Sequence, residues 1–423
     1  MKPKYYDNLI ELCSEIVSQE NKMLPLCAAE NVVSPFCKIP LDTFLQEKYI
    51  MGGTMEYQSS NNFVGSQKLF DIYNLLKLQC TKMYNCKYAD ARTLSGVNAV
   101  TTLLMSIFST GDTILISSEE CGGHGSMPKI CHRLGIKTLE MPYDYAAYDF
   151  DYEEINNLLK NNSINGILIC LSDIIKMPQL HKINLPENCT LIFDATQILG
   201  LIATRKLENP LNWFKDNQKF ILMGATHKTL PGPTCGLIMT NNLTLARSFD
   251  TLINPDYLRN SQLHHILSLI LALMELEIYG ESYCDAIVNN ANNLGGLLAA
   301  KGFNVLKLPT KYTYTHQLFI SMPSASAIEF YNRCIDYGIS LNFRNKQLYK
   351  TCGLRIGTQE ISRYGWKSEE MILIAKILKD IQDTPFVSMD ISNKITVLSK
   401  QKEICYTFDE NYYNTIYSKL HNC

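Results

Sequence analysis

The sequence lacks the features that mark several classes of protein. Its 39 basic and 41 acidic residues nearly balance and no basic tract occurs, which argues against a nucleic-acid partner. The 15 cysteines include no Cys-x-x-Cys pair and no Cys/His group with zinc-finger spacing, so we expect no metal site. A chain of 423 residues does not need disulfides for stability, and we expect reduced, mostly structural cysteines in a cytoplasmic protein.

Membrane-spanning stretches, repeats and low-complexity linkers are also missing from the sequence. Residues 1–7 lack the apolar stretch of a signal peptide. The longest strongly apolar run, from Ile266 to Met274, is too short to cross a bilayer. We therefore expect it to form a buried helix and expect no membrane association.

Short apolar runs alternate with helical stretches between about residues 85 and 245. Because several runs are apolar throughout, we expect strands buried on both faces of a mainly parallel sheet covered by helices. The expected strands are 113–117, 137–141, 166–171, 190–193, 220–223 and 236–239. Ligands of such sheets bind at the C-terminal ends of the strands.

A smaller α+β domain is expected after a long helical region that begins near Gln262. Its expected elements are strands 304–308 and 317–321 and a helix over 326–336. The polar last 40 residues contain a strand-like run, 394–398. We expect an N-terminal helical arm over 1–22, a large domain over 23–280 and a small C-terminal domain over 281–423.

The segment 224–233, Gly-Ala-Thr-His-Lys-Thr-Leu-Pro-Gly-Pro, carries the clearest chemical signal. It places Lys228 in a small polar turn directly after an apolar run. A lysine there can be desolvated, which lowers its pKa and suits imine chemistry. The alternative is a surface lysine in a Gly/Pro turn.

Two further charged residues adjoin apolar strands, where burial requires a partner. Asp194 follows the run 190–193, and a pyridinium N–H would be a suitable partner, although a helix N-cap is the commoner role there. Arg355 lies within 352–358, and its fork suits a substrate carboxylate or a structural ion pair.

Two glycine-containing loops complete the pattern. Ser95-Gly96 opens a predicted helix, whose backbone N–H groups either bind an anion or are simply capped. Glycines around His124 allow the backbone to approach a ligand and leave one face of the imidazole open, unless this is an ordinary glycine-rich loop.

In their order and spacing, these motifs resemble the serine hydroxymethyltransferase family over about residues 20–375. The segment Thr226–Pro233 is the most specific part of the resemblance. The family implies a pyridoxal-phosphate-dependent transferase of fold type I, the aspartate-aminotransferase fold. It implies a large domain with a mainly parallel seven-stranded sheet and a smaller α+β C-terminal domain.

The resemblance assigns the cofactor, pyridoxal 5′-phosphate (PLP), to a defined set of residues. Lys228 would hold it as an internal aldimine, Asp194 would keep the pyridine nitrogen protonated, and His124 would stack on the ring. The other implied cofactor contacts are Ser95, Gly96, Val97, Ser172, Gln197, Thr226 and His227, with Tyr49 from a neighbouring subunit. Arg355, Glu30 and Tyr49 would bind the amino-acid substrate.

Departures from the family pattern concern folate. Met51 stands where the family has its catalytic glutamate, and Glu56 could substitute for it as a catalytic residue. The family's paired tyrosines correspond to Asn62 and Phe63. Its Gly-Gly pair corresponds to Arg259-Asn260, and we expect Arg259 to bind phosphate. A tetrahydrofolate cofactor is therefore doubtful.

These residues together favour aldol-type cleavage or transfer at the Cα–Cβ bond of a β-hydroxy amino acid. The expected donor is serine, threonine or glycine, and an aldolase or transaldolase using an aldehyde is favoured over folate-dependent hydroxymethyl transfer. Transamination, decarboxylation and a non-catalytic homologue are the alternatives. A homodimer with shared active sites is implied, with a tetramer left open.

Overall fold

The computed structural model describes residues 2–55, 63 and 65–421 of the chain. Glu56 and Asn62 lie outside the described residues. The chain forms two compact units. We call residues 30–285 with 406–423 the sheet unit, and residues 1–29 with 286–405 the second unit.

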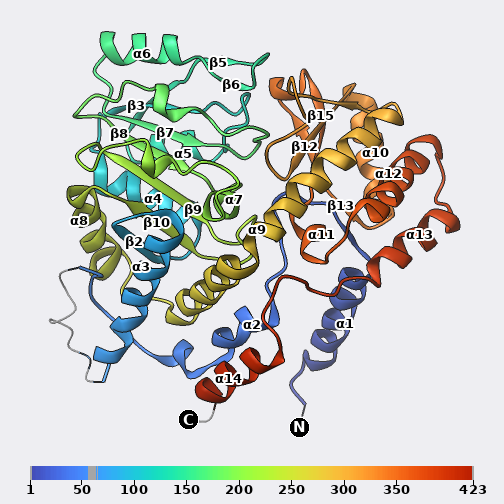
Figure 1. Ribbon diagram of the computed structural model, residues 1–423, viewed down its shortest axis with the longest axis horizontal. Helices are drawn as coiled ribbons and strands as arrows, with labels where there is room; N and C mark the ends of the chain where they lie inside the picture. The colour runs from blue at the N-terminus through green and yellow to red at the C-terminus, as the bar shows by residue number, and fades with distance from the viewer. Residues whose placement is uncertain (1, 56–62, 64, 422–423) are drawn as a thin grey trace. The chain divides into compact units, whose positions relative to one another are not determined.

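A seven-stranded sheet lies at the centre of the described part of the sheet unit (Figure 1). Its strands in spatial order are β2 (Tyr88–Thr93), β10 (Gly236–Thr240), β9 (Phe220–Ala225), β8 (Thr190–Asp194), β7 (Gly166–Cys170), β3 (Thr113–Ile116) and β4 (Lys137–Glu140). Strand β10 pairs antiparallel with both neighbours, and the pairs from β9 to β4 are parallel. The predicted mainly parallel seven-stranded sheet is confirmed.

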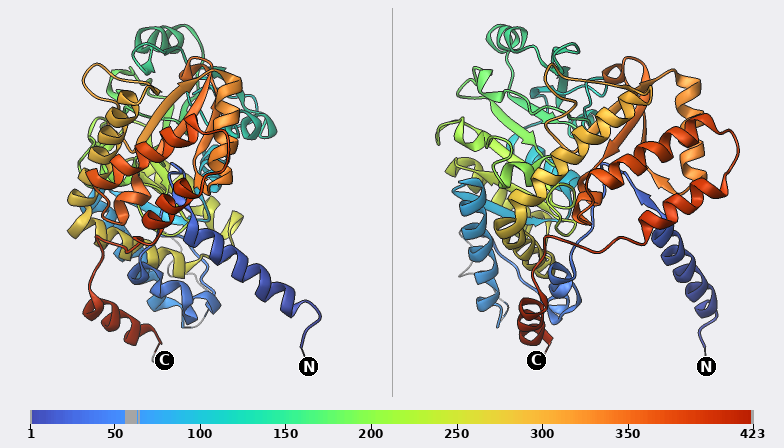
Figure 2. Two further views of the ribbon diagram at one scale, coloured as in Figure 1. Left: turned by 90° about the vertical axis from the view of Figure 1, so that its right-hand side faces the viewer. Right: turned by 45° about the vertical axis from the view of Figure 1, so that its right-hand side comes forward.

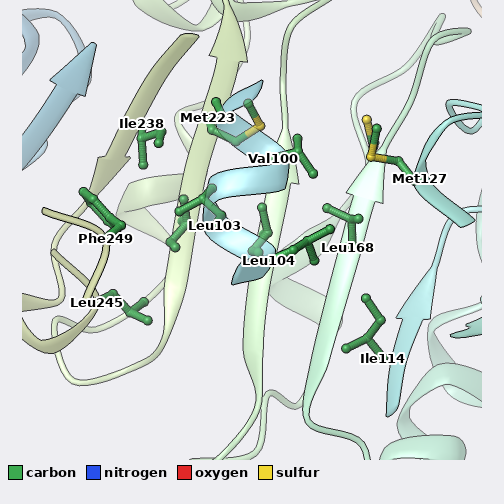
Figure 3. Packing of buried hydrophobic residues seen from close by; sticks show 14 of the residues in the cluster. Val100, Leu103, Leu104, Ile114, Met127, Leu168, Met223, Ile238, Leu245 and Phe249 are labelled. Carbon is green, nitrogen blue, oxygen red and sulfur yellow. The ribbon is translucent and has the colours of Figure 1, made fainter. Parts of the chain in front are cut away.

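Hydrophobic burial explains these strands. Strands β7 and β9 are buried along their whole length, as expected for apolar runs covered on both faces. Helix α4 (Gly96–Ile107) packs on the sheet through Val100, Leu103 and Leu104, whose side chains lie against strand residues such as Leu168 and Met223 (Figure 3). Each fully buried side chain of this kind stabilises the folded state by about 1.5–3 kcal/mol relative to an exposed one. This packing holds the N-terminus of α4 at the edge of the sheet.

The other elements of the sheet unit surround this core. Its short strands are β5 (Tyr143–Asp144) and β6 (Asp149–Phe150). Its further α-helices are α2 (Pro35–Lys38), α3 (Asp71–Tyr84), α5 (Met127–Arg133), α6 (Tyr152–Asn161), α7 (Leu199–Ala203), α8 (Leu243–Thr251) and α14 (Glu410–His421). Its 3₁₀ or π turns are η1 (Ile39–Asp42), η2 (Phe44–Glu47), η3 (Gln67–Phe70), η4 (Leu180–Lys182), η5 (Pro210–Asn212) and η6 (Leu252–Tyr257).

The second unit contains a four-stranded antiparallel sheet flanked by helices. In spatial order its strands are β11 (Asn304–Val305), β12 (Gln317–Met322), β15 (Cys352–Gly357) and β14 (Asn342–Asn345). Strand β1 (Leu24–Pro25) pairs with β13 (Ile339–Ser340). The helical elements are α1 (Tyr6–Lys22), α10 (Ser324–Asp336), η7 (Gln347–Tyr349), α11 (Gln359–Arg363), α12 (Ser368–Asp383) and α13 (Met389–Ser399). The predicted smaller α+β part is confirmed.

One expected strand is wrong. Residues 394–398 lie inside helix α13. Ile391, Ile395 and Leu398 are buried, at a spacing that puts them on one face of a helix. The short run of β-branched residues resembled a strand because a five-residue window cannot separate the two periods.

Helix α1 buries none of its residues, and Figure 2 shows it, in dark blue, extending beyond the rest of its own unit. On this helix, Leu9, Leu12 and Ile16 are more than half exposed, and their side chains lie on the same side. An apolar stripe of this kind suits contact with another surface.

Helix α9 (Leu263–Ala300) contains the boundary between the two units. It is the one described helix that is long and apolar enough to span a membrane by length and composition, yet 61% of its most apolar window is buried. The predicted buried helix over Ile266 to Met274 is confirmed, since Ile266, Leu269 and Leu273 are almost fully buried.

Candidate active site

The C-terminal ends of three neighbouring parallel strands meet at one edge of the large sheet. Strand β7 ends at Cys170, β8 at Asp194 and β9 at Ala225. A pocket enclosing about 210 Å³ opens at this edge. It is lined by Ser95, Gly96, Val97, His124, Cys170, Leu171, Ser172, Asp194, Thr196, Gln197, Ala225, His227 and Lys228. Most of the residues predicted for the cofactor site thus lie around one cavity within the sheet unit.

The N-terminus of α4 forms one wall of the pocket. Ser95 caps the helix, and its Oγ accepts a hydrogen bond from the Asn98 N–H at 3.2 Å. A Cβ atom added to Gly96 would lie 3.0 Å from the Ala225 Cβ, so the helix approaches β9 more closely than a larger residue would allow. The N–H groups of this first turn favour an anion such as a phosphate.

Asp194 presents its carboxylate to the pocket from the end of β8. Its Oδ1 accepts a hydrogen bond from the Thr196 N–H at 2.9 Å, and its Oδ2 lies 2.9 Å from the Cys170 Sγ. The Thr196 Oγ1 accepts a hydrogen bond from the Ala225 N–H at 2.7 Å. Asp194 is therefore held by its neighbours and does not cap a helix, which removes the main alternative to a chemical role.

The glycine-rich loop around His124 is fixed by backbone contacts. The His124 N–H donates to the Cys170 carbonyl at 2.9 Å, and the Ser172 N–H donates to the Gly122 carbonyl at 2.8 Å. A Cβ atom added to Gly123 would lie 2.4 Å from the carbonyl oxygens of Ser117 and Ser118. Only glycine permits this close approach, which brings the imidazole to the pocket.

The loop that carries Lys228 is also well anchored. The Thr226 Oγ1 donates to the Pro233 carbonyl at 2.6 Å, and the Gly232 N–H donates to the Thr226 carbonyl at 2.8 Å. The Asn31 side-chain amide donates both to the Lys228 carbonyl and to the Tyr283 hydroxyl. These contacts hold the lysine backbone while its side chain lines the pocket.

His227 is kept neutral at physiological pH. Burial, and then the nearby positive charge of Lys228, lower the pKa of His227 to about 4. Its Nδ1 is buried and has no hydrogen-bond partner among the described residues. A phosphate ester is the kind of group that could supply one.

Several predicted residues lie outside the pocket lining. Thr226 is buried and bonded to backbone as described above, and Glu30 and Arg259 are exposed. Tyr49 is 39% exposed, and its ring packs against Phe63 with ring centroids 4.5 Å apart. Tyr49 and Arg259 were predicted to act across a subunit interface, so their roles stay predictions. Glu56, the residue that could substitute for the family's catalytic glutamate, lies outside the described residues.

Arg355 belongs to the second unit and is almost fully buried in β15. Its Nε and Nη2 donate to the Asn342 Oδ1 at 3.1 and 2.7 Å. The amide fixes one edge of the guanidinium fork, and its role in substrate binding stays a prediction.

Sequence reasoning missed four lining residues: Cys170, Leu171, Thr196 and Ala225. Each ends a strand or lies one or two residues beyond the end of one. The rule that ligands bind at the C-terminal ends of parallel strands could have identified all four.

The residues around the pocket fit the cofactor that the sequence resemblance implies. The helix N-terminus, the close approach at Gly96 and the unpartnered nitrogen of His227 suit a phosphate. Asp194 suits a protonated pyridine nitrogen, and Lys228 supplies the amine for an aldehyde. No group of three or more His, Cys, Asp or Glu residues in the described part of the chain could hold a metal ion.

Known proteins share both sequence and fold with this chain. The profile of the family described as serine hydroxymethyltransferase matches residues 4–378. Curated serine hydroxymethyltransferases from Sulfolobus acidocaldarius and Thermoplasma volcanium are 27% and 30% identical; they align over 94% and 86% of this chain and 94% and 88% of their own. The crystal structure of an L-threonine transaldolase from Pseudomonas fluorescens in the internal aldimine state superposes with a TM-score of 0.89. It is 21% identical, and the match covers 98% of this chain and 97% of that one.

Proposed function

Because this chain belongs to the serine hydroxymethyltransferase family, and is a PLP-dependent enzyme of the transferase/aldolase type, we propose that it breaks and forms the Cα–Cβ bond of a β-hydroxy amino acid. The donor is serine, threonine or glycine. We favour an aldolase or transaldolase reaction, in which a free aldehyde is released or captured, over folate-dependent hydroxymethyl transfer.

The observation that carries this proposal is the pocket that Lys228, Asp194, His124 and the N-terminus of α4 line together. When bound, PLP supplies an electron sink that stabilises negative charge at the amino-acid Cα. The chain's residues would hold and orient that sink. Lys228 would provide the amine that binds the aldehyde carbon, Asp194 would accept the pyridine N–H, and Ser95 and Gly96 would hold the phosphate.

The segment associated with folate supports the choice of a free aldehyde. The resemblance puts Met51 at the family's glutamate position, and methionine has no group that can transfer a proton. Phe63, in place of a tyrosine, packs on Tyr49 and lacks the hydroxyl. The second candidate, folate-dependent transfer, is favoured by the name that the curated relatives carry.

Two parallel assays separate these reactions. Purified enzyme receives serine with tetrahydrofolate in one assay and threonine with a series of aldehydes in the other. We expect turnover with threonine, with acetaldehyde released and a new β-hydroxy amino acid formed. If the enzyme turns over only in the folate assay, the proposed use of a free aldehyde is wrong. If an amino acid is transaminated or decarboxylated instead, the proposed reaction at the Cα–Cβ bond is wrong.

A lysine variant tests the assigned anchor. We expect Lys228→Ala to lose the yellow absorbance of bound cofactor and to lower kcat by at least about 10³-fold, since a single catalytic acid or base contributes about 10²–10⁴-fold and this residue also binds the cofactor. Lys87→Ala, at an exposed pair with Asp216, is the matched control and should keep both. Retained absorbance with a borohydride-reducible linkage elsewhere would contradict the assignment.

We also propose a homodimer whose contact includes α1. Its exposed Leu9, Leu12 and Ile16 provide an apolar stripe that a second copy could cover. Light scattering should give twice the chain mass, or four times if dimers pair. The double variant Leu9→Glu, Ile16→Glu should be a monomer. If the variant keeps the mass of the wild-type oligomer, α1 is excluded from the contact.

A further inference from the structure

Cys170 and Asp194 lie side by side at the ends of adjacent strands. They are paired in register across the parallel strands β7 and β8. Paired residues in a parallel sheet direct their side chains to the same face. The Cys170 Sγ accordingly lies 2.9 Å from the Asp194 Oδ2, and both residues line the pocket.

The thiol is the donor in this contact. Burial, followed by the negative charge of Asp194, raises the pKa of Cys170 well above its ordinary value. The thiol therefore keeps its proton, and a carboxylate oxygen at this distance is its acceptor. The Thr196 N–H donates to Oδ1 at 2.9 Å, so each oxygen of Asp194 accepts a hydrogen bond from a described residue.

These two donors fix the carboxylate plane. One comes from the backbone two residues beyond Asp194, and the other comes from the neighbouring strand. The main chain of Cys170 is itself held, since its N–H donates to the Ser117 Oγ at 3.1 Å and its carbonyl accepts the His124 N–H at 2.9 Å. A change of the side chain alone leaves these backbone contacts in place.

We propose that Cys170 is a positioning residue, whose thiol donates a hydrogen bond to Asp194 Oδ2 and keeps this carboxylate ionised and aimed at the ring nitrogen of the cofactor. The proposal rests on the proposed function, since it takes Asp194 as the partner of that nitrogen. A hydrogen bond to a charged carboxylate favours the charged form. With the thiol present, the proton shared by Asp194 and the ring stays on the ring, which preserves the electron sink.

Two substitutions separate the hydrogen bond from packing. Cys170→Ala removes the donor, and Cys170→Ser keeps a hydroxyl donor at nearly the same place. Cys131→Ala is the matched control, because Cys131 is a fully buried thiol on α5, within the core of the sheet unit, and does not line the pocket. Thermal unfolding of each apoenzyme checks that all three variants fold.

Two readouts other than activity test the proposal. One is the dissociation constant for PLP, titrated into apoenzyme; the other is the ¹⁵N chemical shift of PLP labelled at the ring nitrogen, followed against pH. For Cys170→Ala we expect PLP binding to be about two- to tenfold weaker, because one hydrogen bond typically makes a net contribution of this size. We also expect the ¹⁵N chemical shift to move toward that of the unprotonated ring. Cys170→Ser and Cys131→Ala should stay close to the wild type.

Each result decides the question. If the wild type binds PLP and Cys170→Ala matches it in both readouts, the positioning role is refuted. If Cys170→Ser is as impaired as Cys170→Ala, packing of the sulfur and not its hydrogen bond matters, which also refutes the proposal. If the wild type itself binds no PLP, the proposed function fails first.

Discussion

A buried charge cluster around Arg92 allows a quantitative test of what holds the sheet unit together. Arg92 lies in β2, three residues before Ser95, and its side chain is fully buried. Its guanidinium donates to the Asp90 Oδ2 and to the Asp250 Oδ1, both at 2.6 Å. It also donates to the Gly52 carbonyl at 3.1 Å. Burial alone would lower the pKa of Arg92, but Asp90 and Asp250 raise it overall, so the cluster is charged in the folded protein.

Replacing Arg92 by methionine should cost about 3–5 kcal/mol. The change keeps an apolar stem of similar length but leaves the carboxylates of Asp90 and Asp250, each only 2% exposed, without their shared cation. Removal of one partner from a buried ion pair costs this much because an uncompensated charge stays buried. The remaining donors to Asp250, from the N–H and hydroxyl of Thr54 at 2.7 and 2.9 Å, offset only part of it.

Denaturant unfolding of the apoenzyme measures this cost. The chain has two tryptophans, Trp213 in the sheet unit and Trp366 in the second unit. A Trp366→Phe background therefore makes fluorescence report on the sheet unit alone. Lys82→Met is the control, since its pair with Glu277 leaves the lysine 62% exposed and such pairs contribute about 0–1 kcal/mol.

A triple variant tests the stated cause. If the cost arises from uncompensated charge, adding Asp90→Asn and Asp250→Asn to Arg92→Met should restore part of the lost stability. A loss below about 1 kcal/mol for Arg92→Met, or a triple variant less stable than the single one, would refute the reasoning.

Two further predictions concern the pocket. The unfolded chain binds a proton to His227 below about pH 6.5, but the folded protein does so only below about 4, so stability should fall as pH drops through this window. In the wild type, His227 should account for a loss of at most about 3 kcal/mol in the free energy of unfolding between pH 7 and pH 4. The His227→Gln variant should lack this contribution when unfolding curves are measured over the same pH range. A Cβ atom added to Gly200 would lie 2.2 Å from the Thr229 carbonyl, so Gly200→Ala should displace the lysine loop and weaken PLP binding. A Cβ atom added to Gly296 would meet no atom of the described residues closer than 3.8 Å, so Gly296→Ala should bind PLP normally in the same titration.

Local sequence patterns predicted much of the fold. The runs at 166–171, 190–193 and 220–223 were predicted as strands, and β7, β8 and β9 lie at these places because continuous apolar runs can be buried on both faces. The run at 394–398 failed because its side chains follow the helical period of α13 over a longer window.

The placement of Lys228, Asp194 and Ser95 around one cavity follows from the rule that ligands bind at the C-terminal ends of parallel strands. Asp194 ends β8, Lys228 lies three residues beyond β9, and Ser95 caps α4. Order along the chain was sufficient here, because the fold converts strand ends into neighbours.

Contacts between residues far apart in the sequence could not be predicted from the sequence. The contact of Cys170 with Asp194 depends on the register between β7 and β8, and the hydrogen bond from Arg92 to Asp250 joins residues 158 positions apart. Residue type and local spacing set which segments become buried strands and which side chains stand at their ends. Only tertiary packing decides which two ends face each other, because register is fixed by the burial of whole strands and not by the residues that meet at their tips.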